Sequence, residues 1–217
     1  MTINDCFSIT DEGNLCGGYT VEQRDLFFGE IEIPVQLNGV MVKSISGFSN
    51  APMTSVTIPN GVKIEAQTFK DCKALRNIKL PHPLSDIFPE TFSGCENLEV
   101  SLLPKTLQHI HEKAFYGCSC IQHIILPASV TEIGSRAFFG CHRDLIINVL
   151  SDDLLFRDFS VQKCHIIFLA ENHLCQHGKE NNSSHPFESG TVLHVPKGSK
   201  AVYKERFLNQ YEIIEIK

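Results

Sequence analysis

The sequence predicts a right-handed, β-rich solenoid, in which the chain winds into stacked coils of 23 residues. The first observation is a row of cysteines that keep this period: Cys72, Cys95, Cys118, Cys141 and Cys164. The second is a row of phenylalanines, each three residues ahead of a cysteine: Phe69, Phe92, Phe115 and Phe138. A Leu-Pro pair also recurs at this spacing, beginning at Leu80, Leu103 and Leu126. Self-similarity at a fixed period is the sequence signature of repeat architectures, so these rows in common register predict a solenoid.

One coil is clear at residues 118–140. Its first strand is indicated by apolar residues with the spacing L-x-x-L-x-L: Ile121, Ile124 and Leu126. Pro127 ends that strand, because proline lacks a backbone N–H and fixes φ. Val130 and Ile133 predict a second short extended piece, and Gly140 suits a tight bend. The apolar side chains are expected to point inward, because one coil cannot bury its own face without stacked neighbours.

This coil resembles the BspA-type (Treponema-type) leucine-rich repeat, whose units read L-x-x-I-x-L-P-x-x-V-x-x-I-G-x-x-A-F-x-G-C. Three pairs match it residue for residue: Ile133-Gly134, Ala137-Phe138 and Gly140-Cys141. Residues 33–45 are similar to the entry segment of that family, and residues 193–203 are similar to its closing segment. The resemblance implies a leucine-rich-repeat superhelix. It also implies a bacterial cell-surface or secreted protein that binds a protein or a host-matrix component.

The pattern divides the chain into four segments. Residues 1–46 are predicted to form an N-terminal β cap, with a hairpin across residues 11–14. Residues 47–169 form the leucine-rich-repeat solenoid of five or six coils, and residues 170–190 form a polar loop. Residues 191–217 form a C-terminal cap with a β-α-β closing segment. Three coils depart from the pattern: Phe48 in the first coil lacks its cysteine, Ser101 stands where Ile78 and Ile124 stand, and Val161 replaces a phenylalanine.

Charge and hydropathy exclude some classes of partner. The chain has 19 basic and 25 acidic residues, for a formal net charge of −6, which argues against a nucleic-acid or anionic-membrane surface. No apolar run approaches the length of a transmembrane helix, so membrane insertion is not expected. The first residues lack the basic start and apolar core of a signal peptide. Either the protein stays inside the cell or a leader has been removed.

Motifs for catalysis and cofactors are not found in the sequence, and we expect no enzyme, cofactor or metal site. It contains no G-x-S-x-G, phosphate-binding loop, G-x-G-x-x-G or H-E-x-x-H. His173, Cys175 and His177 form an H-x-C-x-H pattern, but a solvated loop is favoured over zinc binding. The five periodic cysteines are expected to be reduced core thiols, since in-register coils lie too far apart for ideal disulfides. The sequence leaves open whether Cys6 and Cys16 form a disulfide.

A binding face is predicted on the outward side of the coils. Side chains between the inward positions of each strand point out, and in the later coils several of them are apolar. The candidate binding residues are Val100, Leu102, His123, Ile125 and Ile146. Two alternatives compete: a one-residue slip at Ser101 would bury Val100 and Leu102, or the C-terminal segment would cover the patch. The function expected is recognition of a protein or other extracellular macromolecule, and the alternative is a structural spacer or intracellular scaffold without a ligand site.

Overall fold

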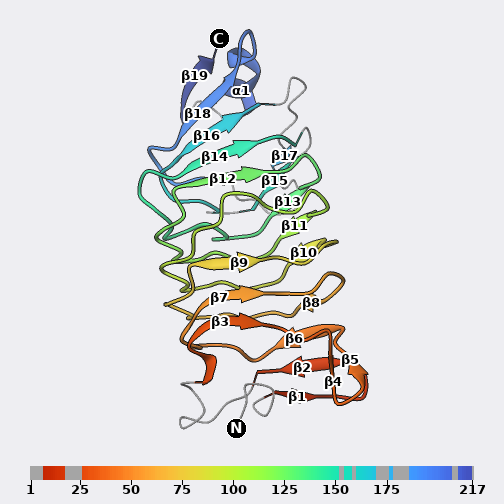
Figure 1. Cartoon of the computed structure of the whole chain (residues 1–217). Coiled ribbons are helices and arrows are strands. Elements are labelled where there is room, and N and C mark those ends of the chain that lie inside the picture. Colours follow the sequence, from red (N-terminus) through yellow and green to blue (C-terminus); the bar gives the residue numbers. More distant parts are fainter. Residues whose placement is uncertain are drawn as a thin grey trace.

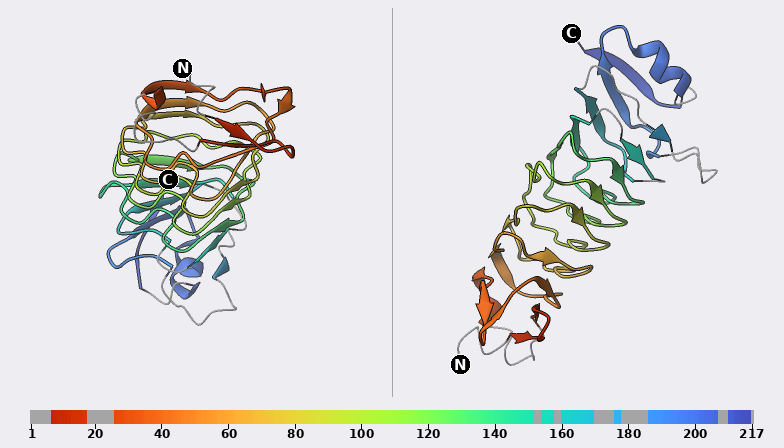
Figure 2. Two further views of the ribbon diagram at one scale, coloured as in Figure 1. Left: turned by 90° about the horizontal axis from the view of Figure 1, so that it is seen from below. Right: turned by 90° about the vertical axis from the view of Figure 1, so that its right-hand side faces the viewer.

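The computed structural model describes residues 7–17, 26–151, 154–157, 160–169, 176–177, 186–206 and 210–216. The chain forms a β-solenoid of about seven turns with little helix, so the predicted fold class is confirmed (Figure 1). The number of turns exceeds the five or six expected, because segments assigned to the cap and to the loop also contribute strands. Viewed from the side, the turns stack into an elongated body with the two termini at opposite ends (Figure 2).

The longest strands form one face of the solenoid, here called the main face, and they run parallel in two sheets. The N-terminal main sheet contains β3 (Gly29–Glu32), β7 (Met53–Thr57) and β9 (Asn77–Lys79). The C-terminal main sheet contains, in order, β12 (His123–Leu126), β14 (Ile146–Val149), β16 (His165–Phe168), β18 (Val192–Pro196) and β19 (Glu212–Ile216). In β12, β14 and β16 the second and fourth residues are buried, as expected when alternate side chains point inward.

The break between the two main sheets lies in the coil that carries Ser101. Ser101 is exposed, whereas its counterpart Ile124 is fully buried, because a hydroxyl in this apolar row would lack a partner. Val100 is half-buried and packs against the core, while Leu102 is 70% exposed. A single parallel bridge from Leu102 to Ile125 joins this coil to β12. Of the two residues that the predicted slip would bury, Val100 therefore turns toward the core, whereas Leu102 stays outside.

A second face is made of shorter strands, most of them two residues long. Its first sheet contains β1 (Ser8–Ile9), β2 (Asn14–Cys16), β6 (Ser44–Ser46) and β8 (Lys63–Ile64). Its second sheet contains β10 (Asp86–Ile87), β11 (His109–Ile110), β13 (Glu132–Ile133), β15 (Leu155–Phe156) and β17 (Gln176–His177). All pairs in these two sheets except the β1–β2 hairpin are parallel, as expected for coils that wind in the same direction.

The core is built from the two periodic rows. Rings of Phe48, Phe69, Phe92, Phe115 and Phe138 stack with centroids 5.3–5.7 Å apart. The five periodic cysteines are free and buried, which confirms the expectation for them. Four of their thiols donate to the phenylalanine carbonyl of the preceding coil, as in Cys72 Sγ to Phe48 O at 3.0 Å. A small side chain that can also donate one weak hydrogen bond fits this position, which explains the repeated cysteine.

Two glycine positions of the repeat have distinct physical reasons. Gly140 has φ +79°, and an added Cβ would lie 3.2 Å from Gly117 Cα. Only glycine adopts this left-handed bend freely, and the glycines of neighbouring coils lie against each other. Gly134 instead lies so close to the preceding coil that a Cβ would lie 2.5 Å from the Glu112 backbone nitrogen. The first position therefore needs a bend, and the second needs close contact between coils.

Both ends differ in part from the expected segments. The N-terminal hairpin of β1 and β2 is present, but β3 and β6 within residues 1–46 already belong to the stacked faces. A second hairpin, β4 (Gln36–Leu37) with β5 (Val40–Met41), lies between them. Residues 170–190, expected as a polar loop, contain β17 and the fully buried Phe187, which bridges to Val161. Phe187 thereby continues the aromatic row beyond the coil that has valine.

The C-terminal cap has the predicted β-α-β order. The helix α1 (Lys200–Arg206) connects β18 to the parallel strand β19. Ser199 Oγ donates to Pro196 O, and the Glu215 carboxylate accepts from the backbone N–H groups of Gly198 and Lys200, both at 3.0 Å. An acidic group at the start of a helix is stabilising, because the first N–H groups have no partner within the helix. No helix in the described ranges is long and apolar enough to cross a membrane.

Candidate functional site

The outward side chains of the C-terminal main sheet, together with Leu102, form the candidate site, here called the outer face. The parallel register aligns these side chains in two columns across the strands. The first column is His123, Ile146, His165, Val192 and Glu212. The second is Leu102, Ile125, Asn148, Ile167, His194 and Ile214. The outer face therefore combines aliphatic side chains with imidazoles and has one carboxylate and no lysine or arginine.

Several aliphatic side chains of the outer face are accessible to solvent. Leu102 is 70% exposed, Ile146 37% and Ile214 40%. Leu150 and Leu169, which directly follow β14 and β16, are also exposed. Their backbone N–H groups donate to the neighbouring strands, so they continue the ladder by one position. Exposed apolar residues are common one at a time, but a contiguous group on one sheet marks an interaction surface.

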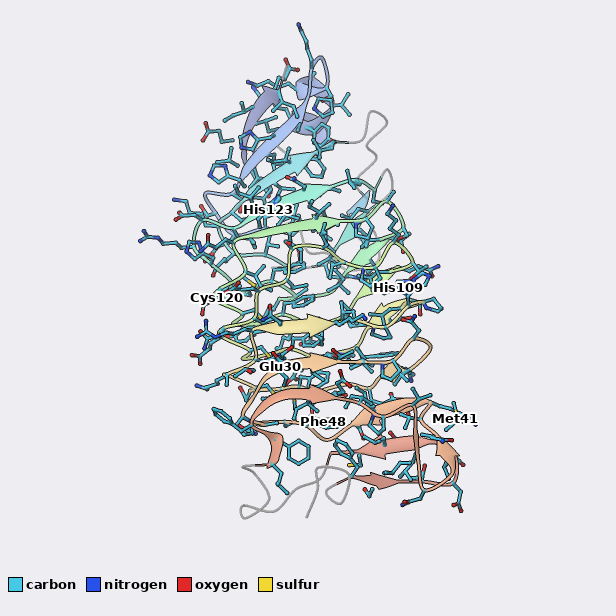
Figure 3. All side chains as sticks on the ribbon, viewed as in Figure 1. Glu30, Met41, Phe48, His109, Cys120 and His123 are labelled. Carbon is cyan, nitrogen blue, oxygen red and sulfur yellow. The ribbon has the colours of Figure 1, made fainter. Side chains whose placement is uncertain are left out.

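The N-terminal main sheet provides an internal comparison. Its outward columns contain Glu30, Ser55 and Asn77 in one row and Glu32, Thr57 and Lys79 in the other. All of these side chains are polar or charged, and Figure 3 places Glu30 on β3, nearer the N-terminal end of the main face than His123. The same backbone surface therefore changes from wholly polar to a mixture of aliphatic and polar side chains where the coil of Ser101 interrupts the sheet. Sheet geometry alone does not require the aliphatic residues of the later coils.

The five binding residues predicted from the sequence are not all in one place. Leu102, His123, Ile125 and Ile146 lie together on the outer face, with Ile125 half-buried between Leu102 and Asn148. Val100 is the exception, because it packs against the core. In the described part of the C-terminal segment, β18 and β19 do not cover this face but extend it alongside β16.

Sequence reasoning missed the part of the outer face beyond β14. Ile167, Val192 and Ile214 extend the columns, but the irregular segment after Cys164 hides their register in the sequence. The sequence signal that could have located these residues is the alternation of inward and outward positions within each strand. In His165–Phe168 and Val192–Pro196 every second residue is a core residue, so the residues between them must point out.

Two features make the centre of the outer face electrostatically unusual. His165 Nδ1 and His194 Nε2 lie 3.0 Å apart, with ring centroids 5.3 Å apart. Desolvation first, and then the neighbouring His165, lower the pKa of His194, against a weaker opposite effect from Glu212. Asn148 Oδ1 is buried between Ile125 and Ile167 and finds no donor among the described residues. An unsatisfied buried acceptor costs about 1–3 kcal/mol, so this position is not optimised for stability.

The thiols, by contrast, are chemically inert. Burial raises the pKa of Cys72 and of Cys164 to about 12, and it also raises the pKa of Cys95, Cys118 and Cys141. Since the thiolate is the nucleophile and metal ligand, these cysteines contribute packing rather than chemistry. Cys16 is a free thiol. Cys6 and the residues His173 and Cys175 of the H-x-C-x-H pattern lie outside the described residues.

Comparisons with known proteins agree with this geometry. Six copies of the BspA type leucine rich repeat region match residues 44–165, which is more than half of the chain. No protein among the curated ones matches. Leucine-rich-repeat solenoid families are generally non-enzymatic.

Three solved structures share the fold. A leucine-rich repeat protein from Bacteroides ovatus is 22% identical over 97% of this chain and 74% of its own, with a TM-score of 0.51. The leucine rich repeat protein of Treponema pallidum is also 22% identical, over 96% and 94%, with a TM-score of 0.56. The pneumococcal vaccine antigen PcpA is 16% identical over 87% and 68%, with a TM-score of 0.54. At these identities the likeness concerns the fold alone, whereas the repeat match covers most of the solenoid: the chain belongs to the BspA-type leucine-rich repeat family.

Proposed function

We propose that this protein is a non-enzymatic recognition module that binds another protein through the outer face. The observation that carries the proposal is the contrast between the two main sheets. The N-terminal sheet presents only polar or charged side chains in its two outward columns. The C-terminal sheet instead exposes Ile146 on β14 and Ile214 on β19, and Leu102 is exposed beside β12 at the edge of this sheet.

The chemistry of the outer face fits a protein partner better than a charged polymer. Its two columns contain no lysine or arginine, so it lacks the permanently charged groups that neutralise phosphate. Aliphatic residues interleaved with imidazole and amide groups give the mixed apolar and polar composition that is found in protein interfaces. The unsatisfied Asn148 oxygen adds a cost that folding alone does not require.

A location at the bacterial cell surface belongs to the same proposal. It rests on the repeat resemblance, and the description of PcpA as a vaccine antigen is compatible with it. A solenoid that served only as a spacer would have no reason to differ between its two main sheets.

Site-specific photo-crosslinking in the native cell tests the proposal. A photoreactive residue replaces Ile146 on the outer face, and in a matched variant it replaces Ser55, which occupies the same column on the polar sheet. We expect a discrete crosslinked protein from position 146 and none from position 55. Position 125 should capture the same partner, because Ile125 lies one strand away in the second column. Equal crosslinking from 55 and 146, or crosslinking only from 55, would contradict the proposal.

A further inference from the structure

The second face carries a cluster that the recognition function does not use. Asp86 on β10 and His109 on β11 are paired in register, and His111 follows two residues after His109. Asp86 Oδ1 lies 3.0 Å from His109 Nδ1 and 3.0 Å from His111 Nε2. The three ligand atoms all lie within 4.8 Å of one another, and the three side chains are 25–39% exposed. Figure 3 shows His109 on the side of the solenoid that carries the short strands.

The parallel stack brings these side chains together. Ile87 and Ile110 point into the core, so the residues that precede them, Asp86 and His109, face outward one above the other. His111 lies outside for the same reason, two positions along from His109. Two strands spaced by about 4.8 Å thus present one carboxylate and two imidazoles on a single surface point.

We propose that Asp86, His109 and His111 bind a divalent zinc ion at the surface, with one coordination position left open. Zinc accepts imidazole nitrogen and carboxylate oxygen at about 2.0–2.2 Å, so tetrahedral ligand atoms lie roughly 3.4 Å apart. The two separations from Asp86 Oδ1, 3.0 Å each, need only a few tenths of an ångström of adjustment. The two histidine nitrogens, which lie within 4.8 Å of each other, move to the same separation when the ion binds. A coordinating nitrogen carries no proton: an imidazolium releases one proton to water when zinc binds, and a neutral ring carries its proton on the other nitrogen.

The surroundings hold the ligands in place. Ser85 Oγ donates to Asp86 Oδ2 at 2.6 Å, which leaves Oδ1 directed at the two imidazoles. The ring of Phe88 stacks on His111 with centroids 5.4 Å apart and an interplanar angle of 11°. Such outer contacts orient metal ligands and are part of the binding site. Burial tends to raise the pKa of Asp86, but the hydrogen bonds from Ser85, His111 and His109 together bring it below its ordinary value.

Neighbouring charged groups are already engaged and do not compete for the ion. Glu132, which lies opposite His109 on β13, accepts a hydrogen bond from Arg157 Nε at 2.8 Å. Lys63 forms an ion pair with Glu65 at 3.0 Å and lies over the Phe88 ring at 4.5 Å. Three protein ligands and partial exposure leave the fourth position to water. This pattern differs from a structural zinc site, whose four ligands are all supplied by the protein.

Calorimetric titration of the metal-free full chain with Zn²⁺ tests the site. We expect one equivalent to bind. Asp86→Asn and His111→Gln should weaken binding by roughly 100-fold or more, because losing even an outer contact weakens affinity by roughly 10–100-fold. Ser85→Ala removes only such an outer contact, so it should weaken zinc affinity by roughly 10–100-fold. The controls are His123→Gln, which removes an exposed histidine elsewhere, and Cys175→Ser, which disables the H-x-C-x-H pattern. Neither should change the affinity.

Two measurements on the wild-type chain avoid any question about folding of the variants. Zn²⁺ should shift the imidazole nitrogen signals of His109 and His111 in the NMR spectrum and leave those of His165 and His194 in place. Bound Co²⁺ should show visible d–d bands without a thiolate charge-transfer band. The proposal is overturned if the wild-type chain binds no zinc, if binding survives Asp86→Asn and His111→Gln, or if Cys175→Ser abolishes it.

Discussion

Removing one ring from the phenylalanine row tests the stacked core. Phe115 is 1% exposed, and its ring lies 5.4 Å from that of Phe92 and 5.3 Å from that of Phe138. Phe→Ala in a core costs about 3–5 kcal/mol of unfolding free energy. Each ring pair contributes about 0.5–1.5 kcal/mol beyond burial, and two pairs are lost. The cavity left by the missing ring cannot close, because backbone hydrogen bonds between coils, such as Phe115 N to Ala137 O at 2.8 Å, fix the coil spacing. We therefore expect the upper half of the range for Phe115→Ala.

Urea unfolding of Phe115→Ala and of a neighbouring control measures this cost. Tyr116 is the control, because it is 38% exposed and stacks on Phe139 from outside the core. Tyr116→Ala should cost about 1 kcal/mol. A loss of less than about 1 kcal/mol for Phe115→Ala, or equal losses for the two variants, would refute the stacked-ring core.

Three further predictions concern the coils and the outer face. Gly134→Ala should destabilise by about 3 kcal/mol, because its Cβ would overlap the backbone of Glu112; an unchanged urea midpoint would contradict the close packing of coils. Thiol labelling of the native protein should leave Cys72, Cys95, Cys118, Cys141 and Cys164 unmodified until denaturant is added, and rapid native labelling of all five would show that the row does not point inward. The pKa of His194 is lowered in the folded state, so the unfolded chain binds more protons below about pH 6.5. The stability that His194 contributes is present above that pH and is lost as the pH falls through the folded value. His194→Gln should therefore flatten the decline in unfolding free energy on acidification, and identical pH profiles would exclude this contribution.

The repeat could be predicted from the sequence because stacking forces equivalent residues into equivalent places. Phe115 and Cys118 show this directly, since each repeats at one period and each contacts its counterpart's coil. The same logic located Leu102, Ile125 and Ile146 on the outer face. The period failed to place Val100. It shows that a coil departs from the pattern at Ser101, but it does not show which side chain takes the place of the serine in the core.

The cluster of Asp86, His109 and His111 could not be predicted for a different reason. Asp86 and His109 are 23 residues apart, so their alignment was available from the period. That His111 reaches back to the same Asp86 oxygen depends on side-chain rotation, which no sequence pattern records. Phe187 was missed because its spacing from Val161 departs from 23, and the polar residues before it indicate a loop.

Binding by charge variants of the outer face tests the central claim most directly. Ile125→Lys places a charge in the second column, and Thr57→Lys places the same charge at the matching position of the polar sheet. With the partner identified by crosslinking, Ile125→Lys should weaken the dissociation constant at least about tenfold, which is about 1.4 kcal/mol, while Thr57→Lys leaves it unchanged. Both melting temperatures should stay near that of the wild type. A large fall in the melting temperature of Ile125→Lys, or unchanged affinity in both variants, would show that the outer face is not the binding surface.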